Sequence, residues 1–180
     1  MAKTHIALLR GINVGGKNRL PMKDLTAMFV GAGCSNVRTY IQSGNVVFDA
    51  PARVASKIAA VVAAEIEKKF GFKTTLVIRS AEELEAASRH PFHAPGVSED
   101  HLAVMFLADL PAPERVAALD PDRSPHDRFI VQGREIFGHY PNGQGQSKLT
   151  NAYFDSKLKT VSTGRNWRTV QTLLQMARGK

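Results

Sequence analysis

The residues best suited to bind a ligand lie in one glycine-rich run that follows the apolar segment His5 to Leu9. Glycine lets the backbone adopt a positive φ and lets a ligand approach closely. Cationic and amide side chains surround these glycines, so the run is suited to contact with a phosphate or a carboxylate. A solvated connection between a strand and a helix can have the same composition. The candidate residues are Arg10, Asn13, Gly15, Gly16, Lys17, Asn18 and Arg19.

Gly11 to Lys17 also matches the first part of the phosphate-binding P-loop, G-x-x-x-x-G-K. However, Asn18 stands where a P-loop has the Ser or Thr that binds magnesium. In a P-loop the helix begins at the lysine, but here Pro21 delays it. The predicted order of strands and helices also differs from the parallel α/β layout in which P-loops occur. The run therefore predicts phosphate contact by backbone amides rather than an NTPase site.

Two further segments are candidates for ligand binding. Gln42, Ser43 and Asn45 flank Gly44 at a predicted hairpin turn, although these residue types are also ordinary turn formers. Thr163 to Arg168 opens the predicted last helix, where Thr163 or Asn166 is a candidate cap. Arg165 and Arg168 would lie beside the positive end of that helix, where an anion is favoured. The alternative is a solvated first turn.

The sequence assigns no catalytic residue, cofactor or metal site. The six histidines show no zinc signature, and Pro91 interrupts the helix that would align His90 with His93. Ser43 lacks the G-x-S-x-G context of a hydrolase nucleophile. We therefore expect no metal and no cofactor, and the sequence leaves open whether the protein is an enzyme.

Composition predicts a globular cytoplasmic protein. The 180 residues are 43% hydrophobic and 22% charged, which is typical of folded domains. No stretch approaches the roughly 18 apolar residues of a membrane helix, and the first residues lack signal-peptide features. The single cysteine, Cys34, excludes an internal disulfide.

The net charge of +8 is unevenly distributed along the chain. Residues 1–79 hold 12 Lys/Arg and 4 Asp/Glu, residues 80–126 hold 3 and 9, and residues 127–180 hold 9 and 3. Basic surfaces attract nucleic acids, nucleotides and acidic metabolites. We expect an anionic small molecule or a nucleic acid as partner and no membrane. The sequence does not indicate the oligomeric state.

Apolar periodicity and turn residues predict the order β-α-β-β-α-β over residues 1–80, with helices opened by Pro21 and Pro51. This is the ferredoxin-like order. Residues 81–180 predict a second, smaller α+β half: a strand, a helix, a hairpin over 128–139, a helix capped by Ser147 and a last helix over 166–178. We interpret this half as a degenerate ferredoxin-like unit. The prediction is an α+β fold with subdomains 1–80 and 81–180.

This topology predicts where the first two candidate segments meet. In a ferredoxin-like unit the first and second strands are parallel, with the third antiparallel between them. The loop after the first strand and the hairpin after the second then lie at the same edge of the sheet. We therefore expect the run Arg10 to Arg19 and the turn Gln42 to Asn45 to form one anion-binding pocket.

Three segments resemble a bacterial family, domain of unknown function 1697: the glycine-rich run, Thr39 to Phe48, and Thr163 to Val170. The resemblance spans nearly the whole chain. It implies a small cytoplasmic α+β protein with two ferredoxin-like subdomains, and it implies no established activity. One departure is His90-Pro91-Phe92, where the family often has Asn before Pro-Phe.

The leading functional hypothesis is a protein that binds a phosphate-bearing ligand, either a nucleotide or a nucleic acid, at the glycine-rich basic loop. One alternative is a small transferase or hydrolase that acts on an anionic metabolite. Another is a protein-interaction module. The aromatic residues of a typical RNA-recognition sheet are absent, which argues against that form of RNA binding.

Overall fold

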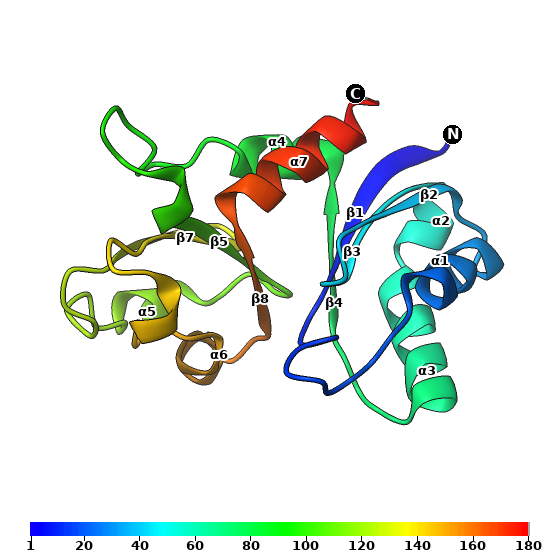
Figure 1. The fold of residues 1–180 in the computed structure, drawn as a ribbon, viewed down its shortest axis with the longest axis horizontal. Helices are drawn as coiled ribbons and strands as arrows, with labels where there is room; N and C mark the ends of the chain where they lie inside the picture. The colour runs from blue at the N-terminus through cyan, green and yellow to red at the C-terminus, as the bar shows by residue number, and fades with distance from the viewer. Residues whose placement is uncertain (180) are drawn as a thin grey trace. The chain divides into compact units, whose positions relative to one another are not determined.

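The computed structural model describes residues 1–179, which form two compact units. The first unit comprises residues 1–85 together with the C-terminal residues from Thr172 onward, and the second comprises residues 86–171. Each unit contains one four-stranded sheet in which all neighbouring strands are antiparallel (Figure 1). The predicted α+β class with two subdomains is confirmed.

The first unit has the predicted β-α-β-β-α-β order. Its elements are β1 (Lys3–Leu9), α1 (Met22–Gly31), β2 (Ser35–Tyr40), β3 (Asn45–Ala50), α2 (Ala52–Ala55), α3 (Ile58–Phe70) and β4 (Leu76–Ser80), followed by α4 (Ala81–Ala87). The strand order is β2-β3-β1-β4. Because β3 lies between β1 and β2 and is antiparallel to both, β1 and β2 run parallel, as the ferredoxin-like topology requires.

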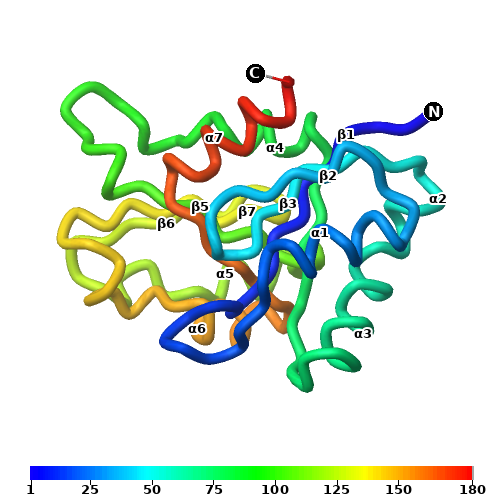
Figure 2. The backbone as a smooth tube through the Cα atoms, turned by 45° about the vertical axis from the view of Figure 1, so that its right-hand side comes forward, coloured from blue at the N-terminus to red at the C-terminus, as the bar shows by residue number. Residues whose placement is uncertain are grey.

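Helices α1, α2 and α3 lie together beside one face of this sheet (Figures 1 and 2). Ala7 and Leu9 alternate along β1 and contribute to the core on that face, where they join Phe29 of α1 and Val62 of α3. Side chains two residues apart on a strand share a face, which explains why Ala7 and Leu9 enter the same core. The predicted helix after Pro51 is interrupted at Ser56 and Lys57, so it forms α2 and α3.

The second unit repeats the same topology. Its elements are η1 (Glu99–His101), β5 (Leu102–Leu107), α5 (Pro113–Ala117), β6 (Arg128–Gln132), β7 (Glu135–His139), η2 (Gln144–Gln146), α6 (Asn151–Leu158) and β8 (Ser162–Asn166). The chain continues into α7 (Trp167–Ala177), whose residues from Thr172 onward belong to the first unit. Its strand order, β6-β7-β5-β8, corresponds element by element to that of the first sheet. The second half is thus a complete ferredoxin-like unit rather than a degenerate one.

Strand β8 is the element that the sequence did not predict. The prediction placed residues 163–168 at the start of the last helix, but Ser162–Asn166 pairs with β5, from Ser162 opposite Leu107 to Asn166 opposite Ala103. The segment is polar, so it lacks the apolar alternation that identifies strands. Its conformation is specified by the hydrogen-bonding edge of β5 rather than by its own side chains.

The starts of the last two helices also differ from the prediction. The last helix begins at Trp167, and the Asn166 side chain caps it by accepting a 2.8 Å hydrogen bond from the Thr169 amide. The preceding helix, α6, is capped by Thr150 and not by the predicted Ser147. Serine and threonine are both good N-caps, so the sequence did not distinguish Ser147 from Thr150.

None of the helices found over residues 1–179 combines the length and the apolar character that crossing a bilayer requires.

Candidate functional site

The glycine-rich run forms a tight hairpin. The Lys17 amide donates to the Val14 carbonyl at 3.0 Å, and both central residues, Gly15 and Gly16, have positive φ (+58° and +75°). This is the type I′ geometry that glycine favours. Helix α1 begins only at Met22, so the lysine does not stand at a helix N-terminus as it would in a P-loop.

Asn13 joins this hairpin to the turn between β2 and β3. Its Nδ2 donates to the Gln42 carbonyl at 2.7 Å and to the Leu20 carbonyl at 3.0 Å, while its Oδ1 accepts from the Leu20 amide at 2.8 Å. The backbones also meet directly, because the Leu9 amide donates to the Gly44 carbonyl at 2.9 Å. The predicted meeting of the two segments is therefore present in the structure.

A shallow pocket of about 340 Å³ lies where these segments meet. Its lining residues are Asn13, Gly16, Arg19, Leu20, Pro21 and Gln42. Arg19 is the single charged residue among them, and none is acidic. Within residues 1–179, neither Arg19 nor the neighbouring Lys17 forms an ion pair. The pocket thus carries uncompensated positive charge.

The other predicted residues of this region support the two turns and do not line the pocket. Asn45 is fully buried, and its Nδ2 donates to the Tyr40 carbonyl at 3.1 Å and to Ser43 Oγ at 2.9 Å. Asn18 Nδ2 donates to the Gly11 carbonyl at 2.9 Å.

The charged neighbours of the hairpin occupy different environments. Lys17 is exposed and directly follows Gly16. Arg10 is half-buried, and its backbone contacts Thr74 and Thr75 at the approach to β4. Of the predicted residues, Asn13, Gly16, Arg19 and Gln42 line the pocket.

The two predicted C-terminal arginines belong to the second unit. Arg165 is buried, and its Nη1 donates to Thr163 Oγ1 at 2.8 Å and to the Gly164 carbonyl at 2.7 Å. Burial lowers the pKa of Arg165 to about 10, so the guanidinium remains charged at neutral pH. Arg168 is exposed, and its Nη2 lies 3.1 Å from Asp100 Oδ1. The expectation that both flank the start of a helix is wrong for Arg165, which lies within β8.

A family model described as "Protein of unknown function (DUF1697)" matches residues 2–137. The chain belongs to this family. A solved structure of the conserved bacterial protein SP0830 from Streptococcus pneumoniae resembles it over 98% of this chain and 99% of that chain. The TM-score is 0.74 at 20% sequence identity, which shows a shared fold. No curated protein matches the chain.

The DUF1697 chain also has a buried histidine that the sequence did not reveal as a core residue. His90 packs against Phe137 and Trp167, with ring centroids 5.2 and 5.1 Å apart. Its Nδ1 accepts from the Phe92 amide at 3.2 Å, and its Nε2 lies 3.0 Å from the Ala103 carbonyl. This pattern requires a neutral ring with its proton on Nε2. Over residues 1–179, no group of three or more His, Cys, Asp or Glu side chains is placed to hold a metal.

Burial lowers the pKa of His90 below its ordinary value of 6.5, and burial also lowers the pKa values of His5 and His139. Below pH 6.5 the unfolded chain binds protons that the folded chain excludes. The free energy of unfolding should therefore decrease as the pH falls from 7.5 to 5.5. Urea unfolding at both pH values measures this change.

The variant His90→Gln, which keeps a donor for the Ala103 carbonyl, should lose part of the pH dependence. His126→Asn, which replaces an exposed histidine of the same unit, is the control for the loss of a histidine as such. An equal slope in His90→Gln and the parent protein would contradict the assignment of the neutral ring.

Proposed function

We propose that the DUF1697 chain binds the phosphate group of a nucleotide or a nucleic acid at the pocket between the N-terminal hairpin and the β2–β3 turn. The proposal rests chiefly on one observation. Arg19 lines a pocket that contains no acidic residue, and it has no ion-pair partner within residues 1–179. Arginine binds phosphate oxygens through planar, charge-assisted hydrogen bonds, so such a side chain is suited to this ligand.

Two further features favour an anion at this position. Pro21, which lines the pocket, is the N-cap of the ten-residue helix α1, and no side chain caps that helix end. The first amides and the positive end of the helix dipole therefore remain available to a ligand. The Gly16 backbone also lines the pocket, and a glycine permits close approach of a phosphate.

A small phosphorylated molecule and a nucleic acid share this chemistry, and salt dependence separates them. A nucleic acid that contacts several basic residues loses affinity steeply as salt rises, because binding releases counterions. A single nucleotide held at one pocket shows a much weaker dependence. Both ligands are available in the cytoplasm, the location that we predict for this protein.

The variant Arg19→Ala should weaken binding of a nucleotide or a short oligonucleotide by about 1–3 kcal/mol, as expected for loss of a charge-assisted contact. A thermal-shift screen of nucleotides and RNA identifies the ligand, and isothermal titration calorimetry then compares the variants. Arg19 is exposed, so the variant should fold with nearly unchanged stability.

Arg53→Ala is the matched control, because Arg53 is also exposed in the first unit but lies on α2, outside the pocket. It should bind the ligand as the parent protein does. Equal weakening in both variants would indicate general electrostatic attraction. Unchanged binding in Arg19→Ala would refute the proposed site.

A further inference from the structure

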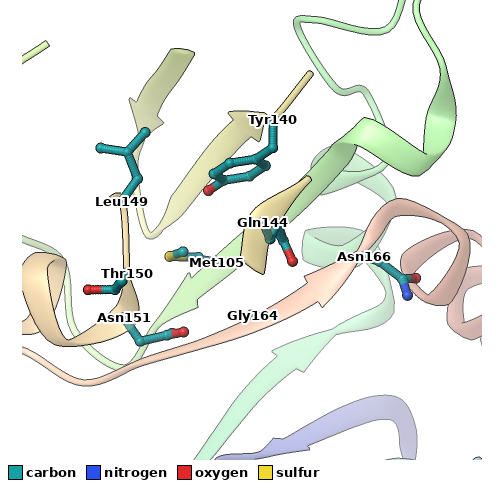
Figure 3. Close-up of a pocket in the computed structure, with 8 residues that line it drawn as sticks. All are labelled: Met105, Tyr140, Gln144, Leu149, Thr150, Asn151, Gly164 and Asn166. Atoms are coloured by element: carbon teal, nitrogen blue, oxygen red, sulfur yellow. The ribbon is translucent and has the colours of Figure 1, made fainter. Parts of the chain in front are cut away.

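A second pocket, of about 320 Å³, lies within the second unit (Figure 3). Three carboxamide side chains line it, from η2 (Gln144), from the start of α6 (Asn151) and from the end of β8 (Asn166). Met105 and Leu149 supply apolar surface, and no charged residue lines the pocket. Its volume is at the small end of the range for ligand sites. An uncharged, compact ligand is therefore indicated.

The orientation of the Asn151 carboxamide is determined by its neighbours. Ser162 Oγ donates its single proton to Asp155 Oδ1 at 2.7 Å, so it must accept the 2.8 Å hydrogen bond from Asn151 Nδ2. This leaves Asn151 Oδ1 as an acceptor without a partner in the described part of the chain. Figure 3 shows that oxygen directed toward Gly164.

Asn166 lines the pocket from the end of β8, but its carboxamide is engaged at the start of α7. Its Oδ1 accepts from the Thr169 amide at 2.8 Å, so its Nδ2 is left as a donor. Asn166 lies two residues beyond Gly164 on β8, and both line the pocket. The pocket therefore presents one oriented acceptor, Asn151 Oδ1, whereas the Asn166 carboxamide points away from Asn151 and Gly164 (Figure 3).

Gly164 keeps this space open. Its φ is not in the left-handed region, so the backbone does not require glycine. A Cβ there would lie 3.8 Å from Met105 Cγ and 3.9 Å from Asn151 Oδ1, which are ordinary contacts. A Cβ at position 164 would thus fit without a clash and would point at two residues that line the pocket. The absence of one leaves a surface of backbone and thioether that suits a flat molecule.

We propose that this pocket binds a nucleobase, as the free base or as part of a nucleoside. Nucleobases are planar and carry neighbouring donors and acceptors on one edge, and Asn and Gln carboxamides pair with such edges. Met105 and Gly164 provide the face against which the ring lies. A sugar fits less well, because it carries hydroxyl groups around its whole ring, and Met105 and Leu149 offer these groups no hydrogen-bonding partner.

Isothermal titration calorimetry with adenosine, guanosine, cytidine and uridine tests the proposal. These probes carry no phosphate, so their binding is independent of the phosphate site proposed above. At least one nucleoside should bind, and methyl glucoside, an uncharged sugar, should not. No binding by any nucleoside at millimolar concentration would overturn the proposal, as would binding of the glucoside with equal affinity.

Two variants locate the binding to this pocket. Gly164→Leu should reduce nucleoside affinity by at least about tenfold, because the side chain occupies the ligand's space. Asn151→Ala should reduce it about threefold to tenfold, the loss expected for one hydrogen bond.

Matched controls are available in the same chain. Gly31→Leu adds the same side chain at an open position, and Asn142→Ala removes a carboxamide outside the pocket. Both should bind as the parent protein does, and thermal unfolding verifies that each variant is folded. Parent-like affinity in both Gly164→Leu and Asn151→Ala would place the nucleoside elsewhere and overturn the assignment.

Discussion

The variant Gly44→Ala is expected to lower the free energy of unfolding by about 2–4 kcal/mol. Gly44 has a φ of +78°, which costs an alanine about 1–2 kcal/mol. Its new Cβ would also lie 2.6 Å from Leu9 Cβ and 2.8 Å from Ile12 Cδ1. The Ile12 methyl can rotate away, but Leu9 Cβ is fixed to the backbone of β1. The turn between β2 and β3 must therefore shift, and overpacking of this kind typically costs about 1–3 kcal/mol.

The same substitution should weaken ligand binding at the N-terminal pocket, because Gly44 is where the two turns touch. Urea unfolding measures the stability change, and calorimetry with the identified ligand measures the affinity. Gly31→Ala is the control, since Gly31 ends α1 with nothing near its Cβ position, and it should be neutral or slightly stabilising. If the stability of Gly44→Ala equalled that of the parent protein, the turn between β2 and β3 would not be in close contact with Leu9 and Ile12.

The variant Gly138→Ala should have a comparable effect in the second unit. A Cβ on Gly138 would overlap the Cε2, Cζ and Oη atoms of Tyr140. Tyr140 is almost fully buried and belongs to the core of this unit. Either the ring leaves the core or β7 shifts. We expect a loss of about 2–4 kcal/mol, near the cost of truncating a buried aromatic residue.

A double-mutant cycle with Tyr140→Leu tests this explanation. If the overlap causes the loss, the two substitutions together should cost clearly less than the sum of the single ones. Gly145→Ala serves as the control, because its Cβ position is open and its φ is not positive. An additive cycle would mean that the cost at Gly138 has another origin. Because Tyr140 lines the second pocket, Gly138→Ala should also reduce nucleoside binding.

The sequence predicted the first unit well because its strands and helices carry clear local signals. β3 is apolar and follows a turn of Ser43 and Gly44, and α1 and α2 have Pro21 and Pro51 as their N-caps. Given that order, the ferredoxin-like topology predicted that the glycine-rich run, which contains Asn13, lies beside the turn that contains Gln42. Arg10, Lys17 and Arg19 are equally cationic in the sequence, so their spacing could not indicate that Arg19 alone lines the pocket.

The second unit was harder to predict because its last strand is polar. Nothing in Ser162–Asn166 alternates in hydrophobicity, so this segment acquires its strand conformation from pairing with β5. That pairing places Gly164 and Asn166 in the lining of the pocket and leaves Arg165 buried. Arg165 and Arg168 were the natural candidates in the sequence, and the neutral residues Gly164 and Asn166 were not.

The sequence by itself determined the α+β class, the order of the first unit and the meeting of the loop with the hairpin, because these depend on local turn and periodicity signals. The tertiary structure alone decided which side chains face a pocket. Asn45 and Asn13 are the same residue type in adjoining turns. Asn45 hydrogen-bonds within its own turn, whereas Asn13 hydrogen-bonds to the other segment and joins the two. Such a difference depends on the partners that folding brings within hydrogen-bonding distance.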